Sequence, residues 1–175
     1  MVETTITGFV NNFTTALNPQ ITKSYARNDT NRLSELLDFG TRIAFYLIIL
    51  MSVPIIIITP DILNLWLTVY PDYAVIFIRI TLAIAIIQSI SNPYITAICA
   101  TGDIRAYQLV VGGITLANIP VCYYLLYLGY NPVIVYFSSL VMYIITFIIR
   151  LLFVRSKVKI NIRILGITMI VRLLP

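Results

Sequence analysis

The chain has 175 residues, of which 59% are hydrophobic and only 11% charged, and its net charge is +5. Soluble domains carry about a quarter charged residues, so this composition excludes an ordinary soluble domain and predicts helices that cross a lipid bilayer. Histidine is absent, which removes the commonest metal ligand and the commonest general base, and we predict no enzyme activity, no metal site and no cofactor.

The first predicted element, residues 4–26, contains a motif that occurs twice. NPQITKSYARND, from Asn18 to Asp29, and NPYITAICATGD, from Asn92 to Asp103, share the template N-P-x-I-T-x-x-x-A-x-[G/N]-D. The second copy lies at the end of a clear apolar run. The alignment therefore predicts that the more polar residues 4–26 cross the membrane as well. Asn28 and Gly102 suit the left-handed residue that follows a helix end.

Four apolar runs follow, each of about 17 to 27 residues, and at a rise of ~1.5 Å per residue each can cross, or nearly cross, ~30 Å of hydrocarbon. The fold class is therefore predicted as an all-α integral membrane protein with five transmembrane helices in paired repeats. Residues 161–175 are expected to form the truncated start of a further span. The linker 23–42 is predicted as an amphipathic helix on the membrane surface or a solvated connecting helix. The four runs cover residues 43–60, 74–100, 106–128 and 133–149.

Basic residues alternate from linker to linker along the chain. The five successive linkers hold four, zero, one, zero and five Lys or Arg residues. Because cytoplasmic loops are enriched in Lys and Arg, the loops around Asn28, Gly102 and Ser156 are predicted to face the cytoplasm, and those around Pro71 and Asn131 the outside. The basic residues form no aromatic-interleaved stripe, so nucleic acid is not expected as a partner.

Polar side chains inside the predicted spans are the candidate site, because such residues are costly in lipid. Gln88 and Asn92 fall with Thr81 and Thr96 on one helical stripe, and the first region repeats it with Thr7, Thr14, Asn18 and Thr22. Such a stripe either joins helices through hydrogen bonds or lines a substrate path. Asn118 is a further candidate for the path. Kinks are predicted where proline interrupts a span, at Pro19, Pro54, Pro93 and Pro120.

Arg79 is the one charge well inside a predicted span. It lies about half a helical turn away from the polar stripe. Its long side chain can extend to the outer headgroups, or it can face a cavity and meet an anionic substrate. Both interpretations stay open at this point.

Three stretches within residues 8–155 carry a resemblance to a known family: GFVNNFTTALNPQITKSYARND (8–29), ILNLWL (62–67) and ATGDIRAYQLVVGGITLANIPVCYYLLYLGYNP (100–132). They resemble the polysaccharide flippases for O-antigen and lipopolysaccharide biosynthesis, within the multidrug/oligosaccharidyl-lipid/polysaccharide exporter superfamily. The resemblance implies that residues 1–160 form part of the second, C-terminal six-helix lobe. It implies a transporter of the bacterial inner membrane in which two six-helix lobes alternate around a cavity. The implied partners are membrane lipid, a polyprenyl-diphosphate-linked oligosaccharide, and the other lobe of the parent protein.

Other functions were weighed against this one. A drug/cation antiporter of the same superfamily typically relies on carboxylates inside the membrane, whereas every Asp and Glu here lies in a loop or at a span end. A membrane enzyme would need reactive groups at the membrane face, and only Asp61 and Asp72 lie on the outer side. A non-transporting membrane scaffold stays open as a further alternative.

Overall fold

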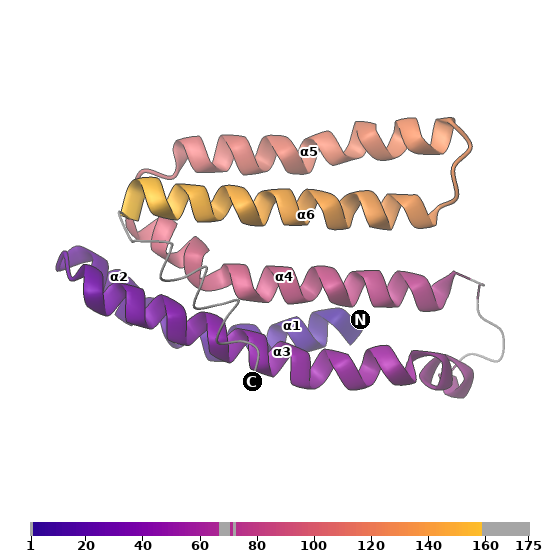
Figure 1. The fold of residues 1–175 in the computed structure, drawn as a ribbon, viewed down its shortest axis with the longest axis horizontal. Coiled ribbons are helices and arrows are strands. Elements are labelled where there is room, and N and C mark those ends of the chain that lie inside the picture. The colour runs from indigo at the N-terminus through magenta and orange to yellow at the C-terminus, as the bar shows by residue number, and fades with distance from the viewer. Residues whose placement is uncertain (1, 67–70, 72, 159–175) are drawn as a thin grey trace.

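The computed structural model describes residues 2–66, 71 and 73–158 (Figure 1), and within these residues the fold is entirely helical. Predicted features at residues 67–70, 72 and 159–175, including the truncated span at 161–175, lie outside the described residues. The helices are α1 (Val2–Thr15), α2 (Asn18–Ala26), α3 (Thr30–Trp66), α4 (Ala74–Ala100), α5 (Arg105–Tyr127), α6 (Val133–Phe153) and the π-helical turn η1 (Val154–Val158).

Four stretches of helix are long and apolar enough to cross a membrane. They are Thr30–Leu65, Ala74–Ala100, Arg105–Tyr127 and Val133–Val158. The prediction of an all-helical fold with membrane-spanning character is thereby confirmed for the described residues. The protein is a membrane-associated, multi-pass chain.

Residues 2–26 differ from these four stretches, because they form two short helices. α1 ends at Thr15 and α2 begins at Asn18, and Pro19, which has no N–H, stands in the first turn of α2. The amide of Leu17 donates to the carbonyl of Thr14 (3.0 Å), closing the turn between the helices. The fifth span and the paired repeats consequently stay predictions.

α3 is longer than the predicted run 43–60. It is continuous over 37 residues from Thr30 to Trp66, so the linker does not hold a separate helix and that prediction is wrong. Asp29 starts the helix, since its Oδ1 accepts the backbone N–H of Arg32 (3.0 Å). Buried Leu33, Leu36 and Leu37 then extend the apolar face of the span. At ~1.5 Å per residue α3 is ~55 Å long, well beyond the ~30 Å of a hydrocarbon core.

Three of the four prolines that were predicted to kink a span lie inside helices. Pro54 lies inside α3, Pro93 inside α4 and Pro120 inside α5. Figure 1 shows that α4 bends toward its C-terminal end and that the last turns of α3 leave the line of the helix. α3 also contains Pro60, which was predicted only as the end of a span.

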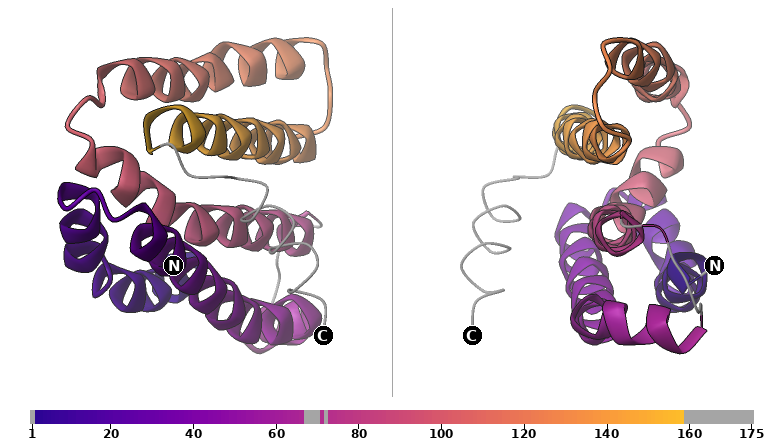
Figure 2. Two further views of the ribbon diagram at one scale, coloured as in Figure 1. Left: turned by 60° about the vertical axis from the view of Figure 1, so that its left-hand side comes forward. Right: turned by 90° about the vertical axis from the view of Figure 1, so that its right-hand side faces the viewer.

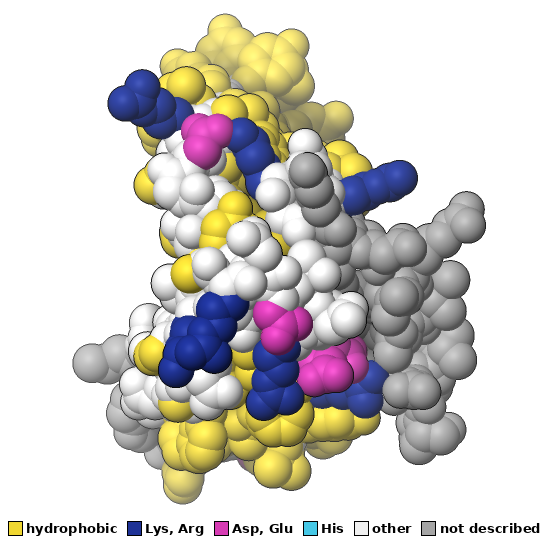
Figure 3. Space-filling view, turned by 90° about the vertical axis from the view of Figure 1, so that its left-hand side faces the viewer, with side chains coloured by type: hydrophobic (Ala, Val, Ile, Leu, Met, Phe, Trp, Pro, Cys, Tyr) yellow, Lys and Arg dark blue, Asp and Glu magenta, His cyan; other side chains and the backbone are white. Residues whose placement is uncertain are grey.

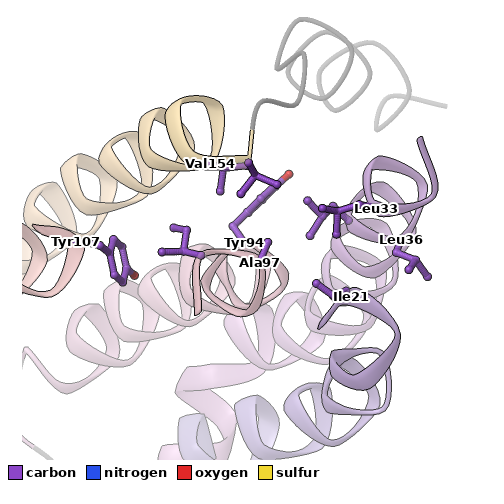
Figure 4. Close-up of a cluster of buried hydrophobic side chains, with 10 residues drawn as sticks. Ile21, Leu33, Leu36, Tyr94, Ala97, Tyr107 and Val154 are labelled. Carbon is purple, nitrogen blue, oxygen red and sulfur yellow. The ribbon is translucent and has the colours of Figure 1, made fainter. Parts of the chain in front are cut away.

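α4 is the central helix of the fold. It packs against α1, α2, α3, α6 and η1, and Figure 2 shows it between α3 and α1 on one side and the α5–α6 hairpin on the other. One core cluster joins α2, α3, α4 and η1 through Ile21, Leu33, Tyr94 and Val154 (Figure 4). A second joins α1, α3 and α4 and includes Val10, Ile48 and Leu82.

The connections lie at two opposite ends of the helices. The α2–α3 and α4–α5 turns and η1 share one end, and the last turns of α3, the start of α4 and the α5–α6 connection share the other (Figure 1). Seen from the first end, Lys and Arg side chains gather with Asp and Glu on the surface (Figure 3), and we call it the basic end. Asn28 (φ 55°) and Gly102 (φ 74°) are both left-handed, as predicted for the two motif copies.

Candidate functional site

The two copies of the repeated motif meet at one helix interface. The Nδ2 of Asn92 on α4 donates to the Oδ1 of Asn11 on α1. One turn further along α4, the Oγ1 of Thr96 donates to the Oδ1 of Asn18 (2.9 Å), the first residue of α2. We call these four residues the Asn-Pro seam, because Asn18 and Asn92 each precede a proline.

The seam joins three helices. Both short helices contact α4, and Asn11 and Asn18 bond to Asn92 and Thr96 on successive turns of α4. The side-chain amide of Asn92 is half-buried and bonded across the interface. Asn92 therefore joins helices, which is one of the two roles predicted for the stripe.

Most threonines of the stripe are satisfied within their own helix. Thr14, Thr22 and Thr81 donate to the carbonyl four residues earlier, at 3.2, 3.0 and 2.8 Å, and Thr7 does so to Glu3 at 2.8 Å. Gln88 is different. It is half-buried and makes no side-chain hydrogen bond to any described residue, so its amide is available to a ligand or to a part of the protein outside the described residues.

Arg79 contacts the backbone of α3. Its Nε donates to the carbonyl oxygen of Ile56 (3.3 Å). In a regular helix that carbonyl would accept the N–H of residue 60, but residue 60 is a proline and has no N–H. Arg79 thus supplies the donor that Pro60 removes, and its exposed side chain lies against α3.

Asn118 joins α5 to α6. Its Nδ2 donates to the Oγ of Ser139 (3.0 Å), and its Oδ1 accepts from Ser138 and from Cys122, both at 3.5 Å. A cavity of about 50 Å³ beside it is lined in part by Thr115, Asn118 and Ser139. Such a cavity holds no more than a few waters, so this cluster holds the hairpin together. The structure does not bring Asn118 to Asn92.

Charged contacts at the basic end tie η1 to the α4–α5 turn. Lys157 Nζ contacts Asp103 Oδ2, and the hydrogen bond from Lys157, followed by its charge, lowers the pKa of the Asp103 carboxyl. At the same end, the Nε of Arg150 on α6 donates to the hydroxyl of Tyr107 on α5 (3.0 Å). The pair of Lys157 and Asp103 thus links the second motif copy to η1, the last described segment.

Neutralising Lys157 is expected to raise the pKa of the Asp103 carboxyl toward its ordinary value, because the hydrogen bond from Lys157 and then its charge are the largest causes that lower it. Because the folded pKa is depressed, the pair contributes fully above that ordinary value and is lost as the pH falls through the folded pKa. A carboxyl NMR titration of labelled aspartate should show the low pKa in the wild type and not in Lys157→Met. Arg105→Gln is the control, because Arg105 is only a minor cause of the shift. An unchanged titration in Lys157→Met would contradict the pair.

Three residues at these contacts were not identified as partners by sequence reasoning. Asn11 counted only as one polar residue among many, and Ser138 and Ser139 lie in an apolar run with no motif. Pro60 could have been found, because a proline inside an apolar run always frees the carbonyl four residues earlier. No group of three or more Cys, Asp or Glu residues that could hold a metal occurs in the described part of the chain.

Comparisons of the chain with protein-family models, with curated proteins and with solved structures found no match.

Proposed function

We propose that the chain is part of the second lobe of a polysaccharide flippase, which moves a polyprenyl-diphosphate-linked oligosaccharide across the bacterial inner membrane by alternating access. In this proposal α1 and α2 together make a fifth, broken span beside the four long helices. The basic end faces the cytoplasm, and the connections that lack Lys and Arg face outward. The function rests on the family resemblance of residues 8–155.

The observation that carries the proposal is the Asn-Pro seam. The short helices α1 and α2 and the proline-containing α4 meet through side-chain amides and a hydroxyl in the second half of α4, where a lipid-facing residue would be apolar. Polar helix contacts in membranes are individually weak, typically ~0.6 kcal/mol. A seam of such contacts suits helices that must repack between two states. A static scaffold would not need interrupted helices at the Asn-Pro seam.

The antiporter alternative has no observation in its favour. Glu35 and Asp38, the carboxylates in the first part of α3, are paired within one turn with Arg32 (3.2 Å) and Arg42 (2.6 Å). Asp61 is exposed near the other end of α3. None of these three lies on α4 beside Gln88 or Asn92, where an ion-coupling carboxylate would be expected.

Replacing Gln88 by leucine is the test of the transport proposal. Since Gln88 has no bonded partner among the described residues, the substitution should leave the amount of folded protein unchanged. If Gln88 lines the path, glycan export should fall at least tenfold, as expected when a polar contact worth about 1.4 kcal/mol is lost. Export would be measured by complementation with the parent protein, normalised to the amount in the membrane.

The matched control is Thr81→Val, which lies on the same stripe but bonds its own helix. It should leave both export and protein amount near the wild-type values. Full glycan export with Gln88→Leu would show that Gln88 does not line the substrate path. Failure of the parent protein itself to support glycan export would contradict the proposed function.

A further inference from the structure

Two adjoining hollows form a groove between α2 and the first turns of α3, at the basic end. One is about 300 Å³ and is lined by the basic residues Lys23, Arg27 and Arg32 and by the acidic residue Asp29. The other is about 420 Å³ and is lined by Leu17, Glu35 and Phe39. Both include Gln20, Arg32 and Leu36, so they are continuous. We call the whole the α2–α3 groove.

The first hollow carries a surplus of positive charge. Arg32 is paired with Glu35 (3.2 Å), and the Oδ1 of Asp29 is occupied by the backbone N–H of Arg32. Lys23 and Arg27 have no ion pair with any residue that the structure describes. They are four residues apart along α2 and its C-terminal cap, which places them on one face, and like charges at this spacing repel. An anion bound between them would relieve that repulsion.

The second hollow is lined by the apolar side chains Leu17, Leu36 and Phe39 and by Gln20, Arg32 and Glu35, and it extends further along α3. Leu36 is buried, and the side chain of Phe39 is 54% exposed. Phe39 is seven residues beyond Arg32, so at ~1.5 Å per residue it lies ~10 Å further along the helix. α3 runs in that direction from the basic end into its apolar, membrane-spanning part. The groove therefore runs from a cluster of basic side chains toward the apolar side chains of Leu36 and Phe39, in the order in which a phospholipid presents its phosphate and its acyl chains.

We propose that the α2–α3 groove binds one anionic phospholipid. Its phosphate is held by Lys23, Arg27 and Arg32, because the guanidinium groups can bind two phosphate oxygens each and Lys23 adds a point charge. One acyl chain follows Leu17, Leu36 and Phe39. A zwitterionic lipid carries no net negative charge to neutralise Lys23 and Arg27. This inference rests on the membrane orientation given above and not on transport, and its test measures binding alone.

The experiment is a titration of the full-length protein in neutral detergent with three probes. Short-chain phosphatidylglycerol should bind more tightly than short-chain phosphatidylcholine, which tests the charge. It should also bind more tightly than glycerol phosphate, which offers the same phosphate ester without acyl chains. Equal affinity for glycerol phosphate would assign the groove to a soluble phosphate compound and overturn the lipid proposal, and equal affinity for phosphatidylcholine would overturn the role of the cations.

Variants localise the binding. Lys23→Gln/Arg27→Gln should weaken phosphatidylglycerol binding by roughly 30-fold, while Arg155→Gln, an exposed cation on η1 outside the groove, should retain it. Phe39→Asn, at a side chain that is 54% exposed, should weaken phosphatidylglycerol binding and leave glycerol phosphate binding unchanged. Unchanged phosphatidylglycerol affinity in the double variant, with its helical content intact, would refute the proposal.

Discussion

Replacing Arg79 by methionine should destabilise the protein, and replacing Pro60 by alanine should remove that dependence. When Pro60 is present, Arg79→Met leaves the Ile56 carbonyl without a hydrogen-bond donor, which costs roughly 1 to 3 kcal/mol when the carbonyl is shielded from water. In Pro60→Ala the new backbone N–H bonds that carbonyl, so the loss of Arg79 costs little. The measurement is a double-mutant cycle of unfolding free energies in mixed micelles.

Arg79→Lys is the matched control, since an ammonium on a long side chain can also donate to a carbonyl. It should retain most of the stability. An equal cost of Arg79→Met with and without Pro60 would contradict the backbone contact. Lost glycan export in Arg79→Lys at normal stability would instead assign the guanidinium to a substrate phosphate, because only its planar fork binds phosphate bidentately.

Changing Asn92 alone to leucine should do more harm than changing Asn11 and Asn92 together. The single change leaves the Asn11 amide without its partner inside an apolar interface, whereas the double change removes both polar groups. We expect the single variant to lose about 1 to 2 kcal/mol and the double variant to recover part of that loss. Protein level and glycan export should fall together in the single variant.

The unfolding free energy and the protein level in membranes check this expectation. Asn12→Leu is the control, because Asn12 is exposed on the same helix and has no role in the seam. If the double variant lost as much unfolding free energy as the two single variants together, the two amides would not interact. Lost export at full stability in Asn92→Leu would place Asn92 on the substrate path instead of at the helix interface.

The helices could be predicted from the sequence where one physical signal dominates. Uninterrupted apolar runs located the long helices, and the [G/N]-D ends located the left-handed residues Asn28 and Gly102, because few residues other than glycine and asparagine accept that conformation. The length of α3 could not be predicted in this way. The sequence predicts that the span ends at Pro60, although a hydrogen-bond donor on a neighbouring helix, such as Arg79, allows a membrane helix to continue through a proline.

The partners within the candidate site could be predicted less well. The stripe of Gln88, Asn92 and Thr96 follows from helical spacing, but spacing does not say which helix lies opposite. Asn11 is not part of the repeated template, so only the packing of α1 on α4 reveals it as the partner of Asn92. In the same way Asn118 was a candidate for the path, and its serine partners on α6 place it at the hairpin interface.

The orientation of the chain in the membrane is the central claim, and cysteine labelling in intact cells tests it most directly. With Cys99 and Cys122 replaced by alanine, single cysteines would be introduced as Ser156→Cys at the basic end and Pro71→Cys at the opposite end, both exposed positions. An impermeant maleimide added outside should label Pro71→Cys in intact cells and Ser156→Cys only after permeabilisation. Labelling of Ser156→Cys in intact cells would contradict the account.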